Sequence, residues 1–589
     1  MSHSIFKNRF NLIAAFLACW AVTISSGITV RNPLTVVFFV FFLLLAERES
    51  FRIKGINNIV SSIISLALSL GLTALLYKRA TASFENRLFK LMGIVILVSG
   101  FFMLGRILLG EKRSRADGEE AASKEKESTS KADAKKHSII DKASAFMAGS
   151  KGAVIAKVMI VCLICWLPYF LYEFPGIMTA DSIVQYYEII GMEPVSNHHP
   201  ILHTLIIAFF YKVGMFISGN PLVVVALYTV FQMIFLSFCC GVLIWHVESL
   251  KIRLFALAFF ALVPFNAVFA VTMWKDIIFA GITMLLLCKL SDFIKDFDNA
   301  GVSYYVLLVI LMILFALFRS NAWYALISWT PFAIFFFRKK LVPFTVSMLI
   351  VIATVVVIKG PVMSSFGVAQ PDLVESLSVP IQQIARMYVD GASMTSDEVE
   401  AIAAVVDTEW IEKLYVANYA DNIKELIRAG HPEVILENKG KYFSLWAGLV
   451  LRHPVEAVKA WFDLVGGYIY PDVAYRVGDI DGVISNEAGI YWNPIIGGKF
   501  VKIKEILIKL GGYVPLYGLL WSIGTYTWAL VISFIRAIRS KDEIITKLLL
   551  IMVIGTLLIA SPVVDFRYGY GIVMTMPLWI EVKKREKAQ

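Results

Sequence analysis

The sequence predicts an all-α polytopic membrane protein with about fourteen transmembrane helices, juxtamembrane helices and a mostly helical external domain. The chain has 589 residues, of which 58% are hydrophobic and only 17% charged, and its mean hydropathy is +0.72. Its apolar stretches are long enough to cross a bilayer as helices, and they lack the alternation of barrel strands. After residue 150, Lys and Arg gather on one side of these stretches, as the positive-inside rule predicts, whereas Lys78, Arg79 and Arg87 fall on the other side. An ordinary soluble domain is therefore excluded.

The first 110 residues predict a four-helix membrane unit. Its apolar stretches lie at 10–28, 33–46, 57–77 and 88–109. The following segment, 111–150, begins with a polar run that mixes both charge signs, as in Lys124-Glu125-Lys126-Glu127. Such a run cannot bury enough apolar surface to order itself, so we expect a flexible cytoplasmic linker.

Residues 151–360 predict a seven-helix module. The expected spans are 153–174, 221–245, 254–273, 276–292, 303–318, 322–337 and 341–360. One further apolar stretch, Ile201–Ile217, is ambiguous. If it spanned the membrane, the basic residues at 251–253 and beyond would fall outside, so we assign it to a juxtamembrane helix.

The remainder of the chain predicts an external domain followed by a C-terminal membrane unit. Residues 361–511 contain helical patterns at 397–406 and 421–428, with short apolar stretches. Residues 512–589 predict a three-helix unit with spans at 512–535, 545–562 and 567–582, which places both termini inside. The net charge of +10 lies mostly beside membrane segments. We interpret it as a topology signal and lipid contact, and expect no nucleic-acid partner.

The loop after the first span of the seven-helix module holds the strongest chemical signal. Asp181 immediately precedes an expected helix at 182–190, for which Thr179 or Asp181 is a candidate N-cap. The alternative is a catalytic role, because a partly desolvated Asp at the mouth of a helix bundle can take a proton from an acceptor hydroxyl or amine. Tyr187 follows on the same helix.

Three histidines close this loop, His198, His199 and His203. His199 and His203 are four residues apart, a spacing compatible with metal ligation on a helix. No matching carboxylates stand nearby in the sequence, so hydrogen bonding to phosphate or sugar is the favoured role. We predict no resident metal or cofactor, although a divalent metal remains an alternative. Cys162 and Cys165 have the spacing of a redox or zinc pair but lie within an apolar stretch, so we expect small buried hydrophobes.

Three short motifs add cations on the side away from the basic clusters. They are Trp274-Lys275-Asp276, Arg319 with Asn321, and Asp565-Phe566-Arg567-Tyr568. The first is equally compatible with an interfacial Trp and a snorkelling Lys. Arginine at the non-cytoplasmic face needs a partner, and a guanidinium matches phosphate oxygens in a bidentate way. Together the motifs predict a site that neutralises a lipid monophosphate.

The order of these motifs over about residues 150–589 resembles the GT-C superfamily of membrane glycosyltransferases. That superfamily includes protein O-mannosyltransferases and aminoarabinose transferases. The resemblance lies in an acidic residue after the first helix of a seven-helix module, His198-His199-Pro200 opening a juxtamembrane helix, and the later Lys and Arg motifs. It is strongest to an uncharacterised bacterial branch with Asn-His-His-Pro in that loop and Pro380-Ile-Gln-Gln-Ile-Ala-Arg386 outside. The chain departs from the superfamily in having a single Asp, followed by Ser182, where an acidic pair is familiar.

The resemblance implies an inverting transfer of a sugar from a polyprenyl-phosphate donor to a glycan, lipid or protein acceptor of the cell envelope. Asp181 would be the general base, Lys275, Arg319 and Arg567 would hold the donor phosphate, and the histidines would orient the substrates. The external segment would cap the site and select the acceptor through Gln382, Gln383, Arg386, Trp446, Tyr468 and Tyr470. The implied location is a bacterial plasma membrane with an extracytoplasmic active site.

The main alternative is a flippase or transporter of a lipid-linked precursor. It would need polar residues at mid-membrane depth, of which Gln232 is one of few. An acyltransferase would want a buried catalytic His, whereas the histidines above cluster in a loop. An inactive scaffold is a third alternative.

Overall fold

The computed structural model describes residues 9–47, 56–80, 87–109, 144–295, 301–473, 475–540 and 543–581. Every named element within these ranges is helical, and the extended pairings there are isolated bridges. The predicted linker at 111–150 lies outside the described residues up to residue 143. The chain forms two compact units: residues 1–145 with 506–522, and residues 146–505 with 523–589. We call them unit 1 and unit 2.

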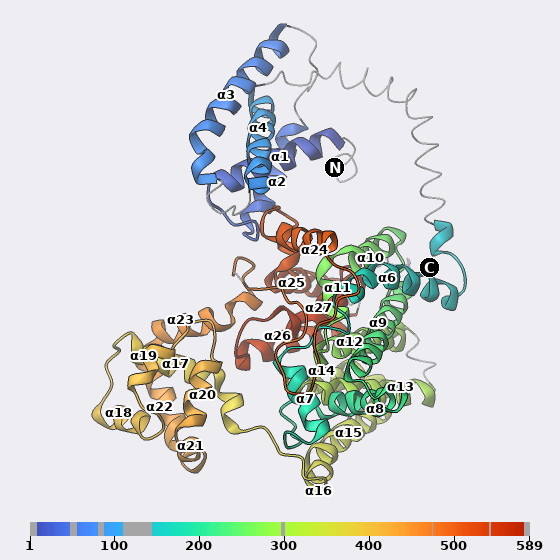
Figure 1. The fold of residues 1–589 in the computed structure, drawn as a ribbon, viewed down its shortest axis with the longest axis vertical. Coiled ribbons are helices and arrows are strands. Elements are labelled where there is room, and N and C mark those ends of the chain that lie inside the picture. Colours follow the sequence, from blue (N-terminus) through green and yellow to red (C-terminus); the bar gives the residue numbers. More distant parts are fainter. Residues whose placement is uncertain are drawn as a thin grey trace. The chain divides into compact units, whose positions relative to one another are not determined.

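Unit 1 contains the four helices expected at the N-terminus. They are α1 (Arg9–Ser25), α2 (Leu34–Ala46), α3 (Ile56–Ala80) and α4 (Arg87–Leu109) (Figure 1). Residues 506–522 also belong here, because Trp20 Nε1 donates a hydrogen bond to the carbonyl of Tyr513 at 2.8 Å, and Phe89 stacks on the same Tyr. The C-terminal unit was predicted to begin at residue 512. Its residues 512–522 instead pack with the N-terminal helices.

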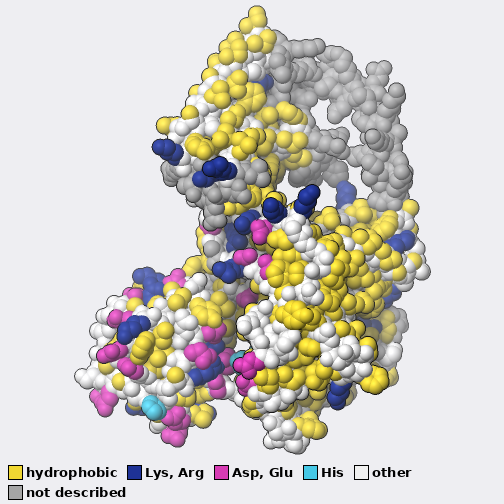
Figure 2. Space-filling model, viewed as in Figure 1, with side chains coloured by type: hydrophobic (Ala, Val, Ile, Leu, Met, Phe, Trp, Pro, Cys, Tyr) yellow, Lys and Arg dark blue, Asp and Glu magenta, His cyan; other side chains and the backbone are white. Residues whose placement is uncertain are grey.

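Unit 2 holds most of the long apolar helices. They include α6 (Lys151–Tyr172), α8 (Ile201–Ser218), α9 (Pro221–His246) and α12 (Lys275–Lys295), and the stretch Arg338–Ser365, which contains α15 (Leu341–Val357). Across the described residues of both units, seven helices are long and apolar enough to cross a membrane, or eight if one bent pair counts as a span. Figure 2 shows hydrophobic side chains over much of the visible surface of the unit 2 helices. The protein is therefore an all-α, multi-pass membrane protein, while the total of about fourteen spans stays a prediction.

Three predicted spans are not continuous helices. The stretch expected at 512–535 begins with η5 (Leu510–Gly512) and η6 (Gly518–Trp521), and its α-helix, α25 (Ile523–Ser540), starts only at residue 523. The stretch expected at 254–273 is α10 (Leu250–Leu262) followed by α11 (Pro264–Ala270), bent by 60°. The bend falls where Pro264 lacks an N–H and its ring would clash with the preceding turn. The stretch expected at 567–582 divides into η7 (Phe566–Gly569), α27 (Tyr570–Met574) and α28 (Met576–Ile580). Pro577 opens the last of these pieces.

The helices of unit 2 differ greatly in burial. Within α12, 78% of the apolar window is buried inside the protein, against 22% for α8. Thus α12 is a central helix and α8 lies at the edge of the bundle. The length and composition of α8 suit a membrane span. Its assignment as a juxtamembrane helix therefore stays a prediction.

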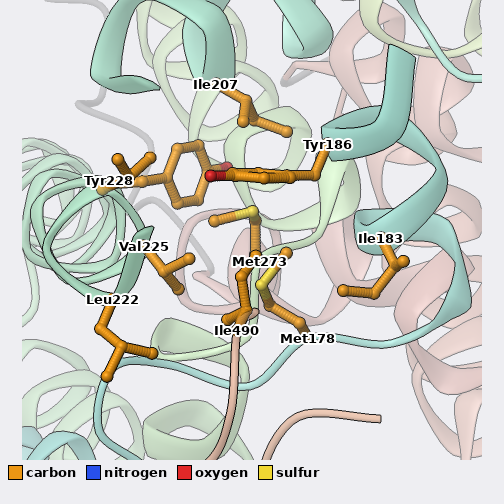
Figure 3. Packing of buried hydrophobic residues seen from close by; sticks show 10 residues of the cluster. Met178, Ile183, Tyr186, Ile207, Leu222, Val225, Tyr228, Met273 and Ile490 are labelled. Atoms are coloured by element: carbon orange, nitrogen blue, oxygen red, sulfur yellow. The ribbon is translucent and has the colours of Figure 1, made fainter. Parts of the chain in front are cut away.

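A buried cluster fixes the helix that carries Asp181, α7 (Ala180–Ile190), against its neighbours. Tyr186 of α7, Ile207 of α8 and Tyr228 of α9 point toward one another and toward Met273 (Figure 3). Two bridges align the strand-like segment before α7, Ile177 pairing with Thr272 and Met178 with Val483. The loop before α7 is thereby held beside the turn that precedes α12.

Residues 373–465 form a small domain of short helices, which we call the helical subdomain. Its elements are η3 (Leu373–Leu377), α17 (Ser378–Val389), α18 (Ser396–Ala403), α19 (Glu409–Leu414), α20 (Asp421–Ala429), α21 (Pro432–Glu437), α22 (Lys439–Arg452) and α23 (Pro454–Val465). Its core is aliphatic, with Ile381, Ile402 and Ile427 among the buried residues. Charged side chains are frequent on its surface (Figure 2). This subdomain occupies most of the segment that the sequence predicts to be external and helical.

After the subdomain the chain returns to the end of α6. The backbone N–H of Asn493 donates to the carbonyl of Phe174 at 2.9 Å, and that of Ile495 to Leu171 at 2.8 Å. The buried Lys504 forms ion pairs with Glu173 and Asp481. Burial raises the pKa of Glu173 to about 7, although Lys504 opposes the shift. These contacts fix residues 480–504 over the loop that leads to α7.

Candidate functional site

Asp181 lies in the first turn of α7. Thr179 takes the N-cap position, but its side chain makes no cap hydrogen bond and instead accepts one from Trp274 Nε1 at 2.8 Å. The helix begins at Ala180, two residues earlier than expected. A carboxylate in the first turn is favoured by the helix dipole. Asp181 therefore does not cap the helix, and its side chain points toward the start of α12.

One oxygen of Asp181 accepts hydrogen bonds from two cations. Lys275 Nζ lies 3.1 Å from Asp181 Oδ2, and Arg567 Nη1 lies 3.0 Å from the same atom. Burial opposes the ionised carboxylate, but Lys275 and Arg567 outweigh it and hold the pKa of Asp181 below its ordinary value. The side chain keeps 28% exposure, so it is accessible from outside the protein. It is thus an ionised carboxylate with one oxygen, Oδ2, bound by both cations.

Arg567 is held in one orientation by its own loop. Its Nε donates to Asp565 Oδ2 at 2.8 Å, and its backbone N–H donates to Asp565 Oδ1 at 2.9 Å. The guanidinium lies 4.6 Å from the centre of the Trp274 ring and 5.1 Å from that of Tyr568. Burial opposes the charge of Arg567, yet Tyr568, Asp565 and Asp181 raise its pKa above the ordinary value. A fixed, permanently charged guanidinium therefore faces Asp181.

A second arginine, Arg319, also contacts Tyr568. Arg319 joins α13 (Val302–Phe318) to α14 (Ser320–Phe336), and it forms an ion pair with Asp276, whose side chain is fully buried. Its Nε donates to Asn321 Oδ1 at 3.1 Å, and its guanidinium lies 4.5 Å from the Tyr568 ring centre. Burial lowers the pKa of Arg319 from its ordinary value. Tyr568 therefore contacts both arginines, which places Arg319 in the same cluster as Asp181.

The three histidines occupy different environments. His199 Nδ1 lies 2.9 Å from Lys275 Nζ, and since an ammonium only donates, this nitrogen accepts. Burial and Lys275 lower the pKa of His199 to about 2, so the imidazole is neutral. His198 is exposed and lies 3.8 Å from Glu375 of η3. His203 is buried, and its ring nitrogens are hydrogen-bonded to Gln185 and Tyr228 at 2.7 and 2.6 Å.

The charges of this cluster balance. Three cations, Lys275, Arg319 and Arg567, are paired with three carboxylates, Asp181, Asp276 and Asp565. Asp276 is fully buried, whereas Asp181 and Asp565 keep 28% and 27% exposure. An incoming anion at Lys275 or Arg567 therefore competes with an exposed carboxylate.

Three other predicted site residues take part in separate contacts. Tyr187 accepts a hydrogen bond from the backbone N–H of Glu487 at 2.7 Å. Gln382 is buried and donates to the carbonyl of Val416 at 2.5 Å. Arg386 forms ion pairs with Asp390 and Asp463 at 2.6 and 2.7 Å. No contact among the described residues links these side chains directly to Asp181.

Two residues gained importance only from the structure. Thr179 positions Trp274, and Glu375 connects the helical subdomain to the loop of the histidines, where the backbone N–H of Asn197 also donates to Ala369. A polar residue just before a helix was a usable signal for Thr179. Nothing in the sequence indicated that Glu375, almost 180 residues further along, faces His198.

Within the described part of the chain, no group of three or more His, Cys, Asp or Glu side chains is arranged to hold a metal ion. The fold and the cluster define a multi-pass, all-α membrane protein with a charge-balanced site. The chain belongs to a family of unknown function (DUF6020), whose profile matches residues 192–589. The match includes both arginines and Lys275 and begins after Asp181. No curated protein and no solved structure matches the chain.

Proposed function

We propose that the protein is a GT-C-type membrane glycosyltransferase. It moves a sugar from a polyprenyl-phosphate donor to a cell-envelope acceptor at the outer face of a bacterial plasma membrane, with inversion. The observation that carries the proposal is the shared contact of Asp181 Oδ2 with Lys275 and Arg567. It supplies, in one place, a carboxylate for general-base chemistry and two cations suited to a phosphate.

The donor phosphate takes the place of the Asp181 carboxylate on Lys275 and Arg567. Arg567 keeps Asp565 and its aromatic neighbours, so its orientation is maintained when Asp181 is displaced. Asp181, now released from its cations, becomes a stronger base. The base is therefore activated by donor binding itself.

The chemical step then proceeds without a covalent intermediate. The acceptor oxygen or nitrogen attacks the anomeric carbon as Asp181 takes its proton. The bond from that carbon to the phosphate oxygen breaks, and polyprenyl phosphate leaves with the electron pair, neutralised by Lys275 and Arg567. General-base catalysis contributes roughly 10²–10⁴-fold, and positioning and charge stabilisation supply the rest.

Capping by the helical subdomain is supported by contacts other than those expected from the sequence. Glu375 faces His198, and the backbone N–H of Ala420 donates to the carbonyl of Pro562, three residues before Asp565. Gln382 and Arg386 are instead held by partners within the subdomain. We therefore propose that the acceptor-facing surface lies at the edge that holds Glu375 and Ala420, and that Gln382 and Arg386 have structural roles.

A flippase or transporter has less support. Gln232, the polar residue expected at mid-membrane depth, donates to the carbonyls of Ala270 and Thr272 at 2.9 and 2.7 Å and accepts from Tyr228. Its hydrogen bonds are thus used to hold the turn before α12.

The deciding experiment measures sugar transfer in proteoliposomes that contain the purified full-length chain. A set of radiolabelled polyprenyl-phosphate sugars is offered with cell-envelope extract as acceptor. We expect label to enter the acceptor with the wild type, and Asp181→Asn to lower the rate by roughly 10²–10⁴-fold. Glu193→Gln, an exposed change in the same loop, is the matched control. Movement of lipid across the bilayer without any new glycosidic bond would instead favour the flippase.

A further inference from the structure

The helical subdomain contains a large apolar cavity. Its volume is about 430 Å³, and its walls come from η3, α17, α18, α19, α20, α21 and α22. The lining side chains are almost all aliphatic, with Ile381, Ile402 and Ile427 deeply buried among them. These residues also form the core of the subdomain. The subdomain is therefore built around a hollow instead of a closed core.

An apolar cavity of this size is more stable when an apolar ligand fills it. Protein interiors pack as densely as organic crystals, and an unfilled apolar space forfeits the dispersion contacts of its lining. Water would not fill it, since buried water needs several polar partners. The two polar aromatic residues of the wall have partners in the protein: Trp446 Nε1 donates to Gln383 at 2.7 Å, and Tyr442 donates to the carbonyl of Ala401 at 2.8 Å. A ligand inside the cavity would therefore contact only aromatic rings and aliphatic side chains.

A lysine lies at the opening of the cavity. Of its lining residues, Lys439 and Phe443 are exposed, so they mark the rim. Lys441 is a further exposed cation next to them. A ligand whose chain enters the cavity would leave its head group at these lysines.

We propose that the helical subdomain binds a single-chain amphiphile with an anionic head, its alkyl chain in the cavity and its acid group at Lys439. The volume falls within the range of about 300–1,000 Å³ that is usual for small-molecule sites. This proposal goes beyond the glycosyltransferase assignment and does not depend on it. The site is connected to the Asp181 cluster, because Leu373 and Leu377 line the cavity while Glu375 between them faces His198.

The test is photolabelling of the full-length protein in phosphatidylcholine nanodiscs. The probe is palmitic acid with a diazirine in mid-chain, and cross-linked peptides are located by mass spectrometry. We expect labelled peptides from α17, α20 and α22. Ile402→Trp fills the cavity and should reduce this labelling by about tenfold. Val399→Trp, at an exposed position of the same helix, is the matched control and should label like the wild type.

A hexadecanol probe with the same diazirine tests the head group. The acid should label more strongly than the alcohol in the wild type, and Lys439→Glu should abolish that preference. This surface change does not alter the core, so it decides the question even if Ile402→Trp fails to fold. Labelling confined to membrane helices, or equal labelling of Ile402→Trp and Val399→Trp, would overturn the cavity as the binding site. An acid preference that survives Lys439→Glu would overturn the role of the lysine.

Discussion

At the scale of single residues, the proposed role of Asp181 conflicts with its surroundings. A general base needs a proton affinity suited to its task, yet the cations beside Asp181 lower its pKa. The conflict is resolved if the anionic donor competes with Asp181 for Lys275 and Arg567. In that case donor binding releases the Asp181 carboxylate from its cations, and the released carboxylate can act as the base.

Replacing Asp181 by Asn should therefore separate binding from catalysis. We expect Asp181→Asn to bind polyprenyl phosphate about tenfold more tightly than the wild type, a gain of about 1.4 kcal/mol, because the competing carboxylate is gone. Affinity is measured by the rise in melting temperature with ligand concentration. Glu193→Gln should behave as the wild type in the same titration. An unchanged or weaker affinity in Asp181→Asn would contradict the competition between carboxylate and phosphate.

We expect His199 to make the stability of the folded protein sensitive to acid. Its folded pKa of about 2 lies below the ordinary 6.5, so between these values the unfolded chain binds a proton that the folded chain does not. The stability that His199 provides is therefore complete above about pH 6.5 and is lost progressively on acidification. The imidazole faces Lys275, Asp181, His198 and His203, and Lys275 outweighs Asp181.

His199→Gln removes this titrating group. Its melting temperature should fall less than that of the wild type between about pH 7.5 and about pH 5. His431→Gln, which changes an exposed histidine of the helical subdomain, is the control and should follow the wild type. Parallel pH profiles for His199→Gln and the wild type would show that His199 is not buried in the neutral form.

At the scale of elements, the loop before α7 depends on a close approach to α9. Gly176 has a φ of +143°, and a Cβ there would collide with the hydroxyl of Thr229. Gly176→Ala should lower the free energy of unfolding by about 1–3 kcal/mol. Gly191, at the C-terminal end of α7, has a φ of +79° and no atom within 4 Å of an added Cβ, so Gly191→Ala should cost only about 1 kcal/mol.

Thermal unfolding in detergent compares the two glycine variants. The double variant Gly176→Ala with Thr229→Ala should recover part of the lost stability, because the colliding hydroxyl is absent. If Gly176→Ala were no less stable than Gly191→Ala, the loop would not be packed against α9 as described.

The sequence predicted the positions of the helices better than the breaks within them. The four helices of unit 1 follow the expected apolar stretches closely, since hydrophobic length determines a membrane helix. The break at Pro264 and the short pieces near Pro577 were missed, because composition alone gives the same hydropathy to a bent and a straight helix. The pairing of Trp20 with Tyr513 joins residues too distant in sequence for any local pattern to indicate.

The sequence indicated which residues lie in the candidate site better than it indicated the contacts between them. Charged residues are rare among apolar stretches and each needs a partner, so Lys275, Arg319 and Arg567 could be assigned from the sequence. The sequence could not show which carboxylate pairs with which cation. Three acids were available, and their pairing depends on how α12, α13 and η7 pack. Gln382 and Arg386 were assigned by position alone, and the structure gives them partners within the subdomain.

At the scale of the whole molecule, the proposed function requires α7 and the helical subdomain to lie on one side of the membrane. Single cysteines placed at Glu193 and Asp397, both exposed, should react with an impermeant maleimide on intact cells. A cysteine at Lys339, also exposed, should react only after permeabilisation. The experiment needs a chain without its six native cysteines. Labelling of position 339 together with 193 on intact cells would contradict the positive-inside topology.

The equal number of acids and cations in the site has a consequence for selectivity. An empty site with three uncompensated cations would hold any small oxyanion in the surrounding medium, such as inorganic phosphate or sulfate. Here every cation already has a carboxylate, so a small ion gains little by exchanging one partner for another. The lipid phosphate of the proposed donor would bring additional binding energy from its hydrocarbon chain. On this proposal the site needs no gate to exclude common salts.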